Sequence, residues 1–98
     1  MDARQMRDHI ERHADAVVRG DTDAVAADFA EGLRPHVSEI AQVLPRPVTG
    51  AEVLSLDVGE TESVAVTRYS GDTGDVMIRS RWQDEDGRPV IVHAERAD

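Results

Sequence analysis

The chain of 98 residues contains no cysteine and no lysine. The missing cysteines exclude disulfides, thiolate nucleophiles and cysteine metal sites, and nothing in the sequence requires an oxidising compartment. The missing lysines exclude Schiff-base chemistry and the phosphate-binding lysine of a P-loop. The first residues are polar, and no apolar run is long enough for a signal peptide or a membrane span. We therefore expect a cytoplasmic protein.

Negative charge is what the chain has in excess, since 20 acidic residues against 11 basic ones give a net charge of -9. The acids are spread along the chain instead of forming a tail, which indicates a solvated acidic surface. Such a surface repels phosphate groups and anionic lipid. Nucleic acids and membranes are therefore not expected as partners.

The N-terminal half has the residue spacing of helices. One apolar stripe runs through 3–19, and Gly20 followed by Asp21 is suited to end that helix and to cap the next one. Apolar residues continue at helical spacing beyond this junction. Three helices are thus predicted over about 3–44, the second of them ending near Gly32.

The second half has strand character. The expected strands are 52–58, 63–70, 75–83 and 89–95. The glycine turns between them are short enough to make neighbouring strands antiparallel. The sequence therefore predicts a single α+β domain over 1–98, with three N-terminal helices packed on a curved four-stranded antiparallel meander over about 51–95.

Both faces of the predicted sheet carry apolar residues. A sheet of this kind usually has two partners, so we expect the helices on one face and a second copy of the chain on the other, forming a homodimer through the exposed sheet face. Arg79 and Arg81 alternate on one strand. With Arg68 they form a positive strip that we expect to pair across the subunit boundary with Glu62 or Glu95. The alternative is that this strip receives an anionic ligand by bidentate contacts.

The order of these features resembles the nuclear transport factor 2-like, or SnoaL-like, superfamily. The resemblance is carried by the Gly20-Asp21 junction, the alanine-rich helix with Phe29 and the Asp86-Gly87 hairpin, and it spans nearly the whole chain. It implies a cone-like fold in which helices wrap a curved sheet, often with dimerisation through the exposed sheet face. It implies no single activity, because that superfamily includes isomerases, cyclases and dehydratases as well as proteins without catalysis.

Five residues are candidates for lining a ligand site. If the turns are tight and free of bulges, Tyr69, Ser80, Trp82 and His93 share one face of the sheet, and His13 lies above them on the helix stripe. Tyrosine can donate a hydrogen bond to an oxyanion, histidine can move a proton, and tryptophan can supply an apolar wall. The same side chains are also typical of packing and interface positions.

His9 and His13 are four residues apart, as metal-binding histidines on one helix face are. Glu11 between them points to the other side of the helix, and no clear third ligand follows. We therefore expect no metal and no cofactor.

The function that we expect from the sequence is a non-enzymatic binding or interaction module for a small apolar ligand. The alternative is an isomerase, cyclase or dehydratase that acts on a small carbonyl compound by general acid and base catalysis. In that alternative His93 and Tyr69 carry the chemistry.

Overall fold

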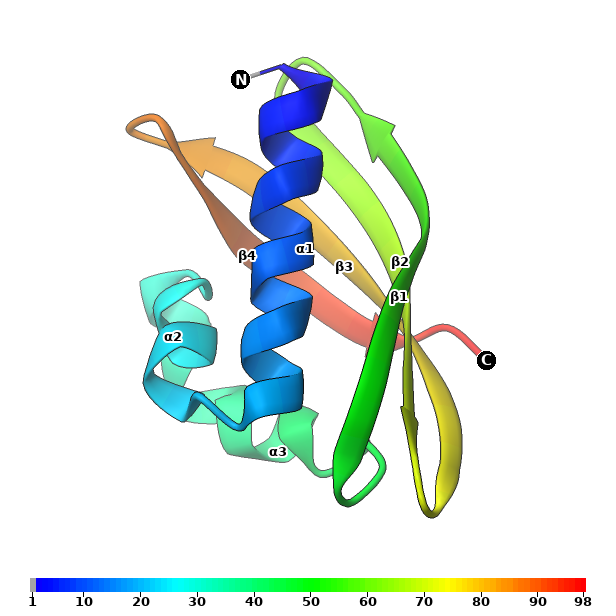
Figure 1. The fold of residues 1–98 in the computed structure, drawn as a ribbon. Helices are drawn as coiled ribbons and strands as arrows, with labels where there is room; N and C mark the ends of the chain where they lie inside the picture. The colour runs from blue at the N-terminus through cyan, green and yellow to red at the C-terminus, as the bar shows by residue number, and fades with distance from the viewer. Residues whose placement is uncertain (1) are drawn as a thin grey trace.

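The computed structural model describes residues 2–98, in which four helical segments precede four strands. The helical segments are α1 (Ala3–Arg19), α2 (Thr22–Ala27), the 3-10 helix η1 (Glu31–His36) and α3 (Val37–Ala41). The strands are β1 (Val48–Val58), β2 (Glu62–Gly71), β3 (Gly74–Glu85) and β4 (Arg88–Arg96). Figure 1 shows α1 lying across one face of the sheet, with α2 and α3 gathered near its C-terminal end. The predicted α+β class is confirmed.

Helix α1 begins and ends where the sequence predicts. The Asp2 side chain accepts a hydrogen bond from the Gln5 backbone in a capping box, and Gly20 at φ 72° ends the helix in the left-handed conformation. Its apolar stripe is buried against the sheet, with Met6 and Ile10 only 4% and 2% exposed. This helix is therefore the main covering element of the sheet.

The second helix is much shorter than the sequence predicts. It ends at Ala27, because the backbone on both sides of Phe29 pairs with the free edge of β4. The Ile91 N–H donates to the Asp28 carbonyl at 2.7 Å, and the Ala30 N–H donates to the Ile91 carbonyl at 2.8 Å. Pairing with an open sheet edge satisfies backbone groups that a longer helix would have bonded internally. The predicted extension to Gly32 is thus wrong.

The sheet is an antiparallel meander in the order β1-β2-β3-β4. Tyr69 pairs with Val76 and Trp82 pairs with Ile91, as the sequence predicts for tight turns. The pairing of β3 with β4 is irregular next to Trp82, since Arg81 pairs with His93. This bulge reverses the face on which the following residues of β4 lie.

Ion pairs within the chain lie on the sheet face that points away from α1. Arg79 lies 3.3 Å from Glu95 and Arg81 lies 2.9 Å from Glu62, each pair joining neighbouring strands. The expectation that these arginines pair across a subunit boundary is therefore corrected. The homodimer itself stays a prediction.

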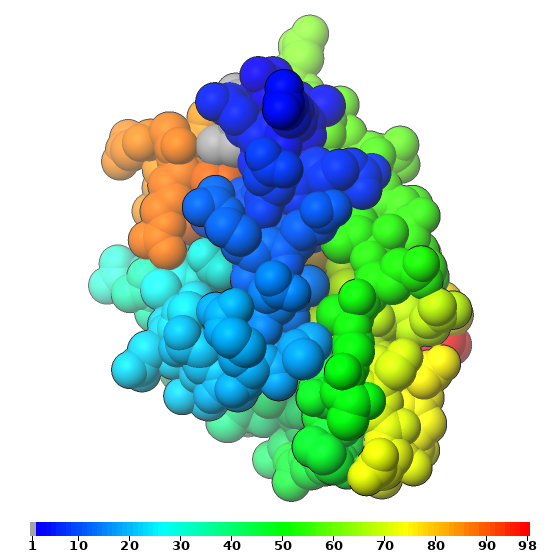
Figure 2. Space-filling view, viewed as in Figure 1, coloured from blue at the N-terminus to red at the C-terminus, as the bar shows by residue number. Residues whose placement is uncertain are grey.

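The buried residues under α1 form two groups. The first contains Met6, Ile10, Phe29, Ala65, Trp82 and Ile91, and the second contains Ala14, Tyr69, Val76 and Ile78. In Figure 2 the residues of α1 and β1 lie side by side on the surface. Among residues 2–98, no helix is long and apolar enough to cross a membrane.

Candidate functional site

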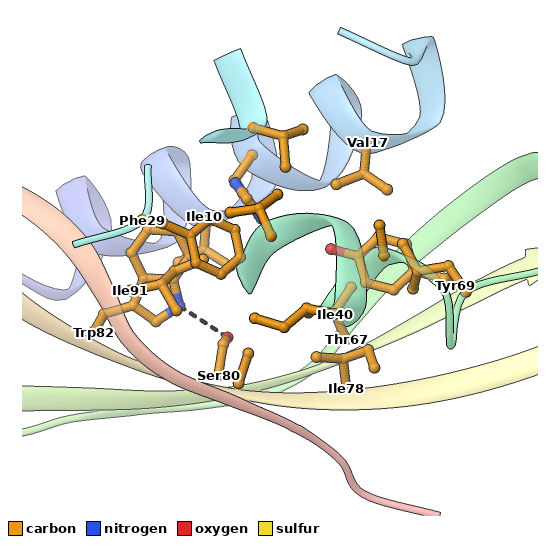
Figure 3. Close-up of a pocket in the computed structure, with 16 residues that line it drawn as sticks. Ile10, Val17, Phe29, Ile40, Thr67, Tyr69, Ile78, Ser80, Trp82 and Ile91 are labelled. Carbon is orange, nitrogen blue, oxygen red and sulfur yellow. Dashed lines mark hydrogen bonds between the residues drawn. The ribbon is translucent and has the colours of Figure 1, made fainter. Parts of the chain in front are cut away.

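A cavity of about 60 Å³ lies between α1, α3 and the sheet. Its walls include Ile10 and Trp82 from the first buried group and Tyr69 and Ile78 from the second, so it marks the seam between the two. Figure 3 shows these side chains converging on one space. Interiors are normally close-packed with few voids, so this space is a candidate site.

Tyr69 supplies a polar group to this cavity. Its side chain comes from β2 and is only 5% exposed, and burial raises the pKa of its hydroxyl well above the ordinary value. Figure 3 shows the Tyr69 oxygen directed into the space among the lining residues. No hydrogen bond joins this hydroxyl to another of the residues that the structure describes, yet no side-chain polar atom among them is fully sealed without a partner. The hydroxyl is therefore available to a molecule in the cavity.

Trp82 forms the floor of the site at the β4 side. It is 1% exposed, and its indole Nε1–H donates to the Ser80 hydroxyl at 2.8 Å, as the dashed line in Figure 3 marks. The imidazole rings of His9 and His13 pack edge-on against the indole, with centroids 5.6 Å and 5.3 Å away. A buried tryptophan with its N–H satisfied is a rigid apolar wall.

The wall at the α1 side contains a buried histidine held by a carboxylate. The Nδ1 atom of His13 lies 2.7 Å from an Asp28 oxygen, and the Nε2 atom of His9 lies 3.2 Å from the other oxygen. An ionised carboxylate only accepts hydrogen bonds, so both rings donate to Asp28. A neutral His13 then has its lone pair on Nε2, and His13 is one of the residues that line the cavity.

The pKa values of Asp28 and His9 are shifted by burial and by the charged groups around them. Burial raises the pKa of Asp28, but the hydrogen bonds and charges of His13 and His9 outweigh it, and the pKa of Asp28 lies below its ordinary value. Burial lowers the pKa of His9, although Asp28 acts in the opposite direction. Arg88 approaches from β4, donating to the Ala27 carbonyl at 2.6 Å with its Nη2 3.6 Å from Asp28. The carboxylate therefore stays ionised at neutral pH.

Four of the five candidates from the sequence line the cavity, namely His13, Tyr69, Ser80 and Trp82. The fifth, His93, does not. The bulge in β4 puts it opposite Arg81 on the outer face, where its side chain is 51% exposed and lies 3.6 Å from Glu95. The placement of His93 with the other four is thus wrong, and a chemical role that pairs it with Tyr69 loses its geometry.

The sequence reasoning missed Asp28. A carboxylate at the C-terminal end of a helix lies at the negative end of the helix dipole, which is an unfavourable place unless another contact compensates. Asp28 occupies this position as the C-cap of α2. The histidine on the apolar stripe of α1 is a sequence signal for a buried polar partner, but Asp28 could not be identified as that partner, because its C-cap position depends on the early end of α2.

An apolar groove on the surface adjoins the cavity. The groove measures about 580 Å³ and runs between the C-terminal end of α1, α3 and the start of β1. Five residues border both spaces: Val17, Val25, Val37, Ala41 and Leu44. No residue of η1 or α3 is buried, so the wall that separates the two spaces is thin.

The described residues hold no group of three or more histidine, aspartate and glutamate side chains arranged to bind a metal ion. The two oxygens of Asp28 are directed at His9 and His13, which bond to the carboxylate itself. The side chains gathered at this site can form hydrogen bonds and transfer a proton.

Neither a protein-family model nor a curated protein matches the chain. Among solved structures, the chain is similar to the solution structure of a SEC-C motif containing protein from Rhodopseudomonas palustris, with a TM-score of 0.62 and 16% sequence identity. The similarity covers 85% of this chain and 71% of that chain. At this identity the likeness concerns the fold alone.

The resemblance to the nuclear transport factor 2-like superfamily is therefore wrong, since the comparisons give a SEC-C motif protein in its place. The residues that carried the resemblance have local explanations. Gly20 ends α1 and Asp21 caps α2, while Asp86 and Gly87 take the positive φ values that a tight hairpin requires. Such features occur wherever a helix or hairpin ends in this way, and they identify no family.

Proposed function

We propose that this protein binds a small, mostly apolar ligand in the space between α1, α3 and the sheet. The proposal is supported above all by Tyr69, a buried side chain whose hydroxyl faces the cavity without a protein partner. The hydroxyl is not fully sealed, so water can bond to it in the free protein, and a ligand group that replaces this water gains about 0.5–1.5 kcal/mol from the hydrogen bond. The ligand is thus an apolar molecule with one polar group near Tyr69.

The size of the space limits the ligand. A cavity of about 60 Å³ is smaller than the void of about 150 Å³ that holds benzene in an engineered protein. The adjoining groove of about 580 Å³ is within the usual range of about 300–1,000 Å³ for ligand sites. A ligand therefore lies in the groove and extends one narrow end into the cavity, displacing side chains of α3 as it enters.

The test uses 1-octanol, which has a narrow apolar body and one hydroxyl. Titration into protein labelled on isoleucine methyl groups should shift the signals of Ile10 and Ile40, which line the cavity. Tyr69→Phe should weaken octanol binding about threefold to tenfold, because one neutral hydrogen bond is lost, while the free energy of unfolding changes by less than about 0.5 kcal/mol. Absence of octanol binding at millimolar concentration would sink the proposal.

The pairing of His13 with Asp28 favours a second candidate, general acid and base catalysis on a small carbonyl compound. His13 lines the same cavity as Tyr69, so a base and a hydrogen-bond donor border one space. His13 takes the place that the sequence reasoning gave to His93. The protein should then exchange the α-protons of 2-octanone for deuterium, and His13→Gln should lose this activity. Equal exchange rates for the parent protein and His13→Gln would contradict a catalytic role for His13.

A further inference from the structure

We propose that the ligand of this site is an amphipathic anion, an alkyl or aryl carboxylate whose charged group lies at the groove mouth. This inference rests on the proposed function and names the chemical class of the ligand. Its basis is the charge of the groove, which differs in sign from that of the protein as a whole. The apolar body then lies along the groove, with its far end at the cavity.

The charged residues that line the groove are both arginines. Arg19 comes from the end of α1, and Arg46 comes from the connector before β1; no aspartate or glutamate among the described residues lines the groove with them. The chain has 20 acidic residues against 11 basic ones, so the charge of the groove lining is opposite in sign to the net charge of the protein. A positive mouth on an acidic protein attracts an anion and repels a cation.

Both arginines have capacity for a ligand. The contact of Arg19 with Asp21 is 4.0 Å long and exposed, a geometry that contributes little. The Arg46 side chain makes no ion pair with another described residue, and only its backbone N–H is bonded, to the Thr73 hydroxyl at 3.4 Å. Planar guanidinium groups bind carboxylates with two parallel hydrogen bonds, which makes a carboxylate the natural partner.

The rest of the groove suits an apolar chain. Its lining is valine, leucine, alanine and proline apart from the two arginines, a glycine and a threonine. The residues shared with the cavity place the cavity and Tyr69 directly beside the groove, so an alkyl chain that displaces them reaches Tyr69. A carboxylate of this class would therefore pair with the arginines and fill the groove, and one that also carries a hydroxyl at its far end would bond to Tyr69.

The experiment compares octanoate with 1-octanol by isothermal titration calorimetry and by the isoleucine methyl signals. Octanoate should bind about threefold to tenfold more tightly than octanol at low salt, and this advantage should shrink as salt is added. Arg46→Gln and Arg19→Gln should each reduce octanoate affinity and leave octanol affinity unchanged. Arg4→Gln, at the far end of α1, is the matched control and should change neither.

A second pair of variants tests the route. Ala41 borders both spaces, and Ala41→Trp should block octanoate and octanol alike. Gln42→Trp, at an exposed neighbouring position that borders neither space, is the control and should bind both.

The outcomes separate the two proposals. Equal affinities for octanoate and octanol, or octanoate binding that survives both arginine substitutions, overturn the anion inference and leave the apolar site standing. Octanoate binding that survives Ala41→Trp shows surface adsorption and overturns both. Failure of both compounds to bind removes the proposed function, and the inference with it.

Discussion

Replacing Asp28 with asparagine should destabilise the protein at neutral pH and much less in acid. The substitution removes the charge that accepts hydrogen bonds from His13 at 2.7 Å and from His9 at 3.2 Å. Only the shorter bond has the length of a strong charge-assisted contact. Arg88 is 3.6 Å away with a half-exposed side chain and adds little. Hydrogen bonds to charged groups contribute about 1.5–3 kcal/mol, so we expect a loss of about 2 kcal/mol at pH 7.

The dependence on pH follows from the direction of the pKa shift. The pKa of Asp28 in the folded protein lies below its ordinary value of 3.8, so the stability that it contributes is complete above that pH and is lost as the pH falls through the lower, folded pKa. The difference between the parent protein and Asp28→Asn should therefore shrink below about pH 4. The lowered pKa of His9 weakens both proteins as the pH falls below 6.5, since the unfolded chain takes up the proton first.

Thermal unfolding followed by circular dichroism measures this effect. For a domain of this size, 1 kcal/mol corresponds to about 4–8 °C, so Asp28→Asn should lower the Tm by roughly 8–16 °C at pH 7. Asp57→Asn, at an exposed position of β1, is the control and should stay within about 2 °C of the parent. An unchanged Tm for Asp28→Asn at pH 7, or a deficit of the same size at pH 7 and pH 3, would refute the reasoning.

Further substitutions test the packing around the site. Gly71→Ala should destabilise the protein by more than about 1 kcal/mol in urea unfolding, because the new methyl group meets the Pro47 carbonyl, whereas Gly50→Ala has open space and should cost less. Ile10→Ala should cost about 2–5 kcal/mol in the same assay, and a loss below 1 kcal/mol would show that the core under α1 is loose. Arg81→Gln should leave the midpoint of urea unfolding nearly unchanged, since its ion pair is exposed, and a clear fall in the midpoint would contradict that view.

Much of the fold could be predicted from local sequence signals. The stripe of α1 and its ending at Gly20 depend on contacts within a few residues, and the pairing of Tyr69 with Val76 depends on the length of one turn. The early end of α2 could not be predicted in this way. It results from pairing between Phe29 and Ile91, which are far apart in the chain, and such pairing overrides helix propensity.

The candidate site also has a part that the sequence predicts and a part that it does not. His13, Tyr69, Ser80 and Trp82 are brought together by periodicity alone, because they lie on regular parts of α1, β2 and β3. His93 follows a one-residue bulge, which no pattern in the sequence marks, and it lies on the opposite face. The prediction placed His93 in the site because it assumed a regular pairing of β3 with β4, and the bulge breaks that pairing.

The most direct test of the account is the position of 1-octanol in the bound state, measured as nuclear Overhauser effects between ligand and protein protons. The account predicts contacts from octanol to the Tyr69 ring and to the Ile40 methyl groups, both of which line the cavity. Contacts confined to Val64 and Val66, on strand positions that alternate with the cavity-facing residues of β2, would contradict it.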